Sequence, residues 1–296
     1  MSIFLDFLLA GIITGALYAL ISVGLTLIYS VMRVVNVAHG DLVTLGAYVL
    51  VVALGAFSVQ GPVGAVVYLL VAIAIGALAG VLIQIFLVAP VLASRQESEQ
   101  RLLVLTLGLS LLLSNGFQVV FGPNVHEVPF LVPGATRIGS IAISNQRLGL
   151  VIVSAVLVVA LIGFLRLTRR GLSIRATADN LEAAQSCGIN TRQAFVVTFA
   201  IGAALAAGVG AFVAPITAVY PPMGFAFTIK AFIVVIVGGL GSLPGALVAS
   251  FLLGISESLA VMWLPSGVAN TISPLVMLLV LLLRPNGLLG RRVGRL

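Results

Sequence analysis

Few side chains in this sequence could do chemistry, and their spacing excludes the common catalytic and metal-binding motifs. The chain has one cysteine, Cys187, and two histidines, His39 and His126, which lie too far apart for a His-Glu-x-x-His zinc helix. The single lysine, Lys230, follows no glycine-rich phosphate loop, and no Gly-x-Ser-x-Gly nucleophile motif occurs. The sequence therefore predicts that this chain is not an enzyme and binds no metal or cofactor of its own.

The composition is that of a membrane protein. Of the 296 residues, 61% are hydrophobic and 8% are charged, whereas about 25% of residues are charged in soluble domains. The net charge of +7 could suggest nucleic-acid binding. However, the basic residues lie at the ends of apolar segments, where they fix topology and meet anionic lipid. We therefore predict a protein of the lipid bilayer with no nucleic-acid partner.

Stretches of mostly apolar residues, each long enough to cross a bilayer, recur along the whole chain. The predicted fold is all-α, a single polytopic transmembrane domain over residues 1–296 with about eight to nine spans. The spans are predicted near 7–31, 41–58, 63–90, 102–121, 149–165, 194–214, 226–239, 245–262 and 268–284. Small residues one turn apart favour close helix packing; these pairs are Gly11 with Gly15, Gly76 with Gly80, and Ala206 with Gly210.

The distribution of basic residues predicts the orientation in the membrane. With nine alternating spans, the N-terminus lies outside and the C-terminus lies in the cytoplasm. This places twelve of the fifteen basic residues inside, as the positive-inside rule requires. The inner set is Arg33, Arg95, Arg101, Arg166, Arg169, Arg170, Arg175, Arg192, Arg284, Arg291, Arg292 and Arg295, and the outer set is Arg137, Arg147 and Lys230.

Three polar residues interrupt the apolar sequence between the first two spans. They are Asn36, His39 and Asp41, and Gly40 beside them permits a break in the backbone. Polar groups at membrane depth are tolerated where they are buried in protein or line a wet cavity. Two interpretations stay open: these residues line a transport path or its gate, or they form an inner loop in which Asp41 caps the second helix.

Glu257 is a carboxylate within the eighth predicted span, which makes a role in a transport path the default hypothesis. It lies only about five residues, or about 8 Å, from the outer end of that span, so it could instead accept hydrogen bonds at the surface. Lys230 is expected to snorkel towards the outer surface.

Glycines and a proline separate the seventh and eighth spans. Because Gly238, Gly239, Gly241, Pro244 and Gly245 cannot form a stable uninterrupted helix, we predict a tight turn there. The two prolines Pro221 and Pro222 are expected to end a helix at the outer mouth.

The longest hydrophilic segment, 166–192, is predicted to contain one short helix. Asp179 can cap it, with Glu182 as the third residue, and Gly188 is a natural stop. Leu181, Ala184 and Cys187 would then share one face. Such a helix suits docking into the groove of a partner, and the alternative is a connector that lies on lipid.

Several of these motifs together resemble the permeases of branched-chain amino acid ABC importers, of the LivH type. The resemblance covers essentially the whole chain, in order. It rests on the strings Gly24-Leu-Thr-Leu-Ile-Tyr29, Asn36-Val-Ala-His-Gly-Asp41, Leu45-Gly-Ala-Tyr48, Glu182-Ala183-Ala184 with Gly188, and Gly238-Gly-Leu-Gly-Ser-Leu-Pro-Gly245.

The resemblance implies one half of a pore in the inner (plasma) membrane of a bacterium, paired with a second homologous, LivM-like permease. Two cytoplasmic ATPase subunits, which use ATP and Mg, would dock on the loop 166–192. A periplasmic or lipid-anchored binding protein would deliver the amino acid. Alternatives are a urea or short-amide importer of the same family and an ion-coupled secondary transporter, although the titratable candidates for ion coupling lie near the two edges of the membrane rather than at its middle.

Overall fold

The chain forms a helical bundle with one small β-hairpin. The structure is a computed structural model that describes residues 2–56, 59, 61–93, 98–138 and 141–290. Arg95, Arg291, Arg292 and Arg295, used above for orientation, lie outside these residues, as do residues 57–58 at the end of the second predicted span. The elements are α1 (Ser2–Met32), α2 (His39–Ala56), α3 (Gly61–Ile83), the π-helical turn η1 (Gln84–Val88), α4 (Ala89–Ala93), α5 (Ser98–Phe121), β1 (Ala135–Ile138), β2 (Ile141–Ser144), α6 (Asn145–Leu167), α7 (Arg169–Asp179), α8 (Leu181–Ser186), α9 (Thr191–Val213), α10 (Met223–Gly238), α11 (Leu243–Ala260), α12 (Ser266–Ala269) and α13 (Ile272–Leu283).

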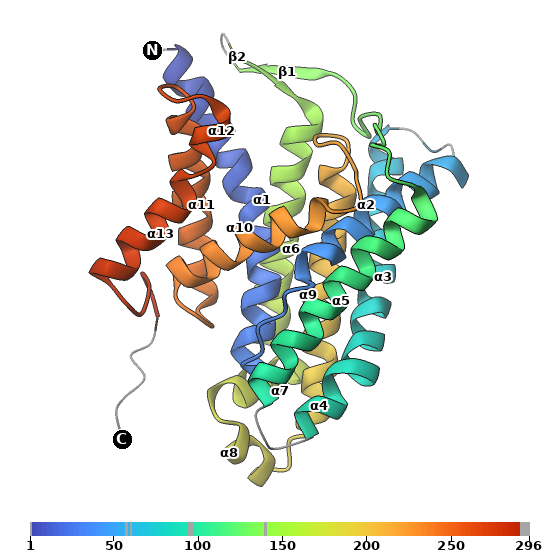
Figure 1. The fold of residues 1–296 in the computed structure, drawn as a ribbon, viewed down its shortest axis with the longest axis vertical. Coiled ribbons are helices and arrows are strands. Elements are labelled where there is room, and N and C mark those ends of the chain that lie inside the picture. Colours follow the sequence, from blue (N-terminus) through green and yellow to red (C-terminus); the bar gives the residue numbers. More distant parts are fainter. Residues whose placement is uncertain (1, 57–58, 60, 94–97, 139–140, 291–296) are drawn as a thin grey trace.

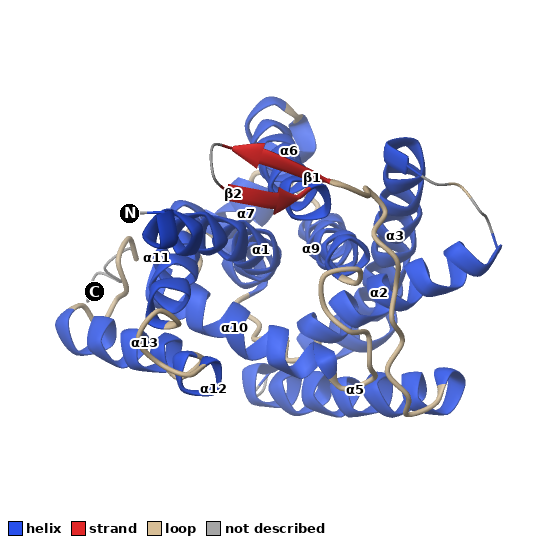
Figure 2. Cartoon of the chain, turned by 90° about the horizontal axis from the view of Figure 1, so that it is seen from above, coloured by secondary structure: helices blue, strands red, loops and turns tan. Residues whose placement is uncertain are grey.

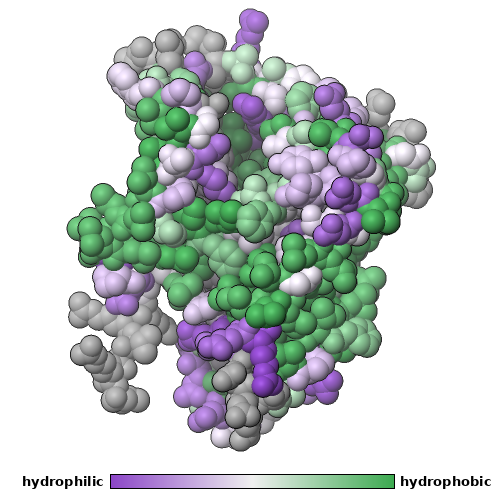
Figure 3. All heavy atoms as spheres, viewed as in Figure 1, coloured by the Kyte–Doolittle hydropathy of each residue, from purple (hydrophilic) through white to green (hydrophobic). Residues whose placement is uncertain are grey.

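Each of the nine predicted spans overlaps an apolar helix in its described residues, and the span 63–90 runs through α3, η1 and the start of α4. In the described part of the chain, seven helices are long and apolar enough to cross a membrane. The helices α10 and α13 are apolar but have only 16 and 12 residues, which is shorter than the hydrocarbon core of about 30 Å requires. Figure 3 shows hydrophobic side chains over the middle of one face and hydrophilic ones towards its two ends.

The long helices run between two distinct ends of the molecule (Figure 1). The N-terminus and the β-hairpin lie at one end, and α7 and α8 lie at the other. Strands β1 and β2 pair antiparallel, with Ala135 opposite Ser144 and Thr136 opposite Ile143. This hairpin and the helix α7 were not predicted from the sequence.

The second helix begins inside the bundle rather than at its surface. The segment 33–38 leaves the end of α1 and runs back beside it, because His39 at the start of α2 lies against the backbone of Ile21. Ile21 precedes the end of α1 by eleven residues, or about 16 Å of helix. We call residues 33–38 the re-entrant segment. In consequence α2 lies across the bundle, as Figure 2 shows for both α2 and α10.

Helices α1–α2–α3 and α9–α10–α11 have matching packing partners. Helix α3 packs on α9 as α11 packs on α1, and α2 contacts α9 as α10 contacts α1. The pairs α1–α9 and α2–α10 also contact each other. Since α1 and α9 run in opposite directions (Figure 1), the two halves are arranged as an inverted repeat.

Small residues allow these helices to approach closely, as their spacing predicted. Gly11 and Gly15 lie against the backbone of α11, and Gly76 and Gly80 lie against α9. A Cβ atom on Gly210 would stand 1.8 Å from the carbonyl oxygen of Val43 in α2. The core is therefore built on backbone-to-backbone contact around α1 and α9.

Candidate functional site

Threonines from two other helices hold the re-entrant segment in place. The Val37 amide donates to Thr106 Oγ1 of α5 at 3.2 Å, and that oxygen lies 3.2 Å from the Val35 carbonyl oxygen. On the other side, Thr228 Oγ1 of α10 lies 3.1 Å from the Val37 carbonyl oxygen. Backbone groups without partners are costly inside a membrane. The two threonines therefore supply the hydrogen bonds that a helix would otherwise provide.

Helices α2 and α10 cross at two glycines. The Gly40 amide donates to Thr228 Oγ1 at 3.0 Å. A Cβ on Gly40 would stand 1.9 Å from the Gly224 carbonyl oxygen, and a Cβ on Gly224 would stand 2.8 Å from the Asp41 amide nitrogen. The first turns of the two helices thus touch without any intervening side chain. Pro221 and Pro222 directly precede α10, so they introduce a helix rather than end one, contrary to our expectation.

The polar residues at this crossing are almost completely buried and keep unused hydrogen-bonding capacity. His39 Nε2 lies 3.0 Å from the Ile21 carbonyl oxygen, while His39 Nδ1 has no partner among the described residues. The same holds for both side-chain polar atoms of Asn36 and for Asp41 Oδ2, and the three residues are at most 1% exposed. An inner surface loop would expose them. We call Asn36, His39, Gly40 and Asp41 the crossing site.

An apolar cavity of about 200 Å³ adjoins the re-entrant segment. It is lined by Leu25 and Tyr29 of α1, by Val34 and Val35, and by α10 side chains that include Phe232 and Ile236. A cavity of this kind accepts an aliphatic or aromatic group. It lies between the crossing site and the ends of α1 and α10.

Glu257 does not join the crossing site. It accepts a hydrogen bond from the Tyr18 hydroxyl at 2.6 Å, another from Ser273 Oγ, and it forms an ion pair with Lys230. We call Tyr18, Lys230, Glu257 and Ser273 the carboxylate cluster. It ties α1, α10, α11 and α13 together. Lys230 is therefore paired within the bundle and does not snorkel outwards as expected. Helix α10 carries both Thr228, which contacts Gly40, and Lys230 of the carboxylate cluster.

The predicted glycine turn connects α10 and α11. Gly239 and Gly241 have positive φ values of 101° and 81°, which only glycine adopts without strain. Gly238 and Gly245 lie in direct contact, because a Cβ on Gly245 would stand only 2.0 Å from the Gly238 oxygen. Pro244 lies in the first turn of α11, and the Ser242 hydroxyl accepts from the Gly245 amide. This turn therefore brings α10 and α11 into close contact.

The segment 166–192 contains two short helices instead of one. Asp179 is the last residue of α7, and the cap of α8 is Asn180, whose side chain accepts from the Ala183 amide at 3.0 Å. The expected cap at Asp179 is thus wrong by one residue. Gly188 does end the unit, with a φ of +78°.

The expected shared face of α8 is divided. Ala184 is buried against the rest of the chain, whereas Leu181 and Cys187 are exposed. Glu182 and Ala183 are also exposed. Ala184 therefore fixes α8 on the bundle, and the side chains available to a partner are its neighbours.

Sequence reasoning missed Thr106, Thr228, Tyr18 and Ser273, which complete the two polar groups. Their only signal was a hydroxyl within an apolar run. Such hydroxyls usually bond to their own helix, so the sequence gives no reason to single them out. Gly224 carried a stronger signal, because it directly follows Pro-Pro-Met.

Comparison with known proteins places the whole chain in one family. Residues 7–284 match the family model described as "Branched-chain amino acid transport system / permease component". The chain is 33% identical over 301 residues to the high-affinity branched-chain amino acid transport system permease protein LivH of Escherichia coli K12, covering 97% of this chain and 96% of the relative. The permease protein BraD of Pseudomonas aeruginosa is 29% identical, with the same shares.

A probable LivH of Methanocaldococcus jannaschii is also 29% identical, over 95% of this chain and 90% of the relative. No solved structure matches the chain. The matches extend from the first helix through the crossing site, the segment 166–192 and the glycine turn to the last helix. The chain therefore belongs to the family of branched-chain amino acid ABC transport permeases, and it is the membrane-spanning, non-catalytic component of such a system.

Proposed function

We propose that the crossing site is the gate of a pore that this chain forms with a second, homologous permease. The observation that supports it is the burial of Asn36, His39 and Asp41 with unused polar atoms where α2 crosses α10. Each buried polar group without a partner costs about 1–3 kcal/mol. An arrangement in which water or substrate reaches these atoms removes that cost, so the closed crossing is poised to open.

The contacts of α10 favour it as the moving element. It meets α2 through glycine backbones and Thr228, and it meets α11 and α13 through Lys230 and Glu257. A tilt of α10 would separate Gly224 from Gly40 and uncover the crossing site. The turn at Gly239 and Gly241 would act as its hinge.

The energy comes from partner chains in this proposal. Two cytoplasmic ATPases hydrolyse ATP with Mg, and their movement reaches the bundle through α7 and α8. A periplasmic or lipid-anchored binding protein delivers the substrate to the opposite end, beside the β-hairpin. The membrane is the inner (plasma) membrane of a bacterium, with the N-terminus outside and the C-terminus in the cytoplasm.

The substrate we propose is a branched-chain or related hydrophobic amino acid. The relatives are named for this activity, and the apolar cavity beside the re-entrant segment suits an aliphatic side chain. Urea and short amides lack such a group. Competition of leucine uptake by urea in reconstituted vesicles would distinguish the two substrate classes.

The gate is tested by cysteine accessibility. In a Cys187→Ser background, His39→Cys is placed in the assembled transporter and treated with a bulky thiol reagent. We expect protection in the resting state and reaction in a state reached during ATP turnover. Reaction at the same rate in every nucleotide state would show an ordinary exposed loop and refute the gate. Asn36→Ala and His39→Ala should reduce leucine uptake per ATP hydrolysed while assembly persists.

A further inference from the structure

We propose that a groove at the α7–α8 end of the bundle binds the phosphate headgroup of an anionic phospholipid. The groove has a volume of about 370 Å³, within the range of about 300–1,000 Å³ for ligand sites. The first turns of α9 form its floor. Arg170, Ser173 and Ile174 of α7 form one wall, and Ile85 of η1 forms the other.

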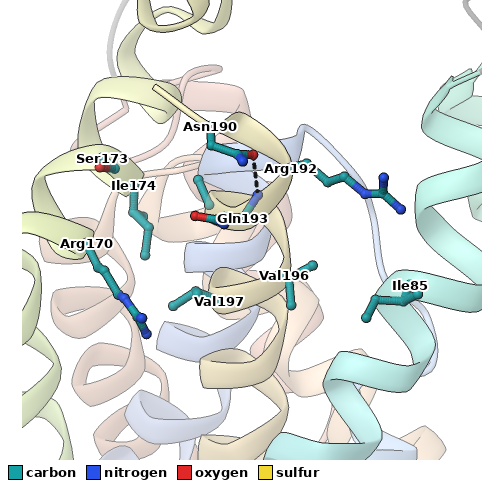
Figure 4. Close-up of a pocket in the computed structure, with 10 residues that line it drawn as sticks. Ile85, Arg170, Ser173, Ile174, Asn190, Arg192, Gln193, Val196 and Val197 are labelled. Carbon is teal, nitrogen blue, oxygen red and sulfur yellow. Dashed lines mark hydrogen bonds between the residues drawn. The ribbon is translucent and has the colours of Figure 1, made fainter. Parts of the chain in front are cut away.

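Two arginines flank the floor of this groove. In Figure 4, Arg170 extends along one side of α9 to the level of Val197, and Arg192 extends from the other side towards η1. No acidic residue lines the groove. The ion pair found among the described residues joins Lys230 and Glu257 and does not involve either arginine. The backbone amide of Gln193 already donates a hydrogen bond to the Asn190 side chain, so this amide is not available to a ligand. Two guanidinium groups without carboxylate partners favour a phosphate.

The remainder of the groove is apolar and continues into a lipid-facing surface. Val196 and Val197 lie between the two arginines in Figure 4, and Ile85 faces them from η1. On the same stretch of the third span, Leu82 is 46% exposed and Phe86 is 69% exposed. A free phosphate would make no use of these side chains. A phospholipid fits both parts, because its acyl chains can follow Val196 and Ile85 while its phosphate lies beside the arginines.

This proposal depends on the membrane location of the chain and not on the gate or the coupling role. The test uses the full chain, purified and delipidated, with fluorescent phosphatidylglycerol as the probe. Phosphatidylcholine serves as the lipid without net charge. We expect phosphatidylglycerol to bind more tightly than phosphatidylcholine. Each arginine should contribute about fivefold to the affinity, so the double variant Arg170→Gln with Arg192→Gln should bind phosphatidylglycerol about 25-fold more weakly. The matched control, Arg169→Gln with Arg175→Gln, changes the same charge on the same side but leaves the groove intact. We expect its affinity to stay within about twofold of the native value, because neither of these side chains lines the groove.

Several outcomes would overturn the proposal. Equal binding by the groove variant and the control would show general attraction to basic residues. Displacement by a large excess of inorganic phosphate would identify a free-anion site. In the assembled transporter, a photoreactive phosphatidylglycerol should label the peptide that contains Val196. Labelling of the native chain elsewhere, or capture of an ATPase subunit by a photoreactive residue at Val196, would assign the groove to another occupant. This last measurement decides the matter even if the double variant fails to fold.

Discussion

Glycine acts at the crossing site by allowing two backbones to touch, and this makes the site sensitive to a single methyl group. A Cβ on Gly40 would meet the Gly224 carbonyl oxygen and Thr228 Oγ1, and a Cβ on Gly224 would meet Thr44 Oγ1 and the Asp41 amide. Gly24 and Gly202 likewise bring α1 and α9 together beside His39, where Gly202 also lies against the Ile28 side chain. At Gly40 the nearest atom is a backbone oxygen, so the two helices themselves must separate when a Cβ is added there.

Gly40→Ala is predicted to abolish most transport. The new Cβ would stand 1.9 Å from the Gly224 oxygen, and overpacking of this kind costs about 1–3 kcal/mol. We expect a lower melting temperature and leucine uptake reduced by at least about tenfold. The matched control is Gly163→Ala in α6, where nothing lies within 4 Å of the added atom. Normal uptake by Gly40→Ala would show that α2 and α10 are not held in this arrangement.

Glu257→Gln is predicted to destabilise the chain through Lys230. Removing one partner of a fully buried ion pair costs about 3–5 kcal/mol, and we expect less here because the Lys230 side chain is 19% exposed. Thermal unfolding in detergent should show the loss, and adding Lys230→Met should restore part of the stability. The control is Glu99→Gln, an exposed acid at the start of α5. If the double variant is less stable than Glu257→Gln alone, the pairing does not explain the burial of Glu257.

The apolar helices could be predicted from hydropathy, whereas the path of the chain between them depends on long-range contacts. The apolar helices were found because a bilayer span has a fixed length and composition. The re-entrant segment was not predictable, since Val34, Val35 and Val37 are as apolar as a helix. Its path depends on Thr228, which is 191 residues away from Val37 in the sequence.

The prediction of the helix cap in 166–192 was wrong because two adjacent residues could both serve as the cap. Asp179 and Asn180 both cap helices well, and the structure uses Asn180 because α7 continues through Asp179. The helix α7 itself was missed because its arginines suggested a loop. Asn36, His39 and Asp41 are buried, as only one of the two open interpretations required. Glu257 was grouped with them because it is an acid within a span, and its partner Lys230 could not be recognised from the sequence.

Leu181→Asp with Glu182→Lys is predicted to uncouple transport from ATP hydrolysis. Both side chains are exposed on α8, so the fold should survive, whereas a change at the buried Ala184 would disturb it. We expect normal membrane insertion but loss of ATPase binding, or ATP hydrolysis without uptake. The matched control is Val125→Asp with Glu127→Lys, an exposed pair near the end of α5 at the opposite end of the bundle. Equal uptake by the two variants would contradict the coupling role.

The inverted repeat explains why the crossing site lies in the interior of the bundle. Each half contains a long helix, α1 or α9, followed by a chain that turns back and begins the next helix, α2 or α10. Because the halves run in opposite directions, α2 and α10 start from opposite sides and meet at their first turns. Such a pair can open towards one side by the movement that closes it towards the other.

The native Cys187 gives a test of orientation without any change to the chain. It is the only cysteine in the sequence and is exposed beside α8, at the end where five arginines of 166–192 gather. The positive-inside rule predicts that this end lies in the cytoplasm. A membrane-impermeant maleimide should therefore label Cys187 in inverted vesicles and leave it unlabelled in intact cells that lack the partner ATPases. A Glu127→Cys variant in a Cys187→Ser background should behave in the opposite way, because residue 127 lies at the other end of the bundle. Labelling of Cys187 in intact cells would reverse the orientation, and the partner assignments for both ends would have to be exchanged.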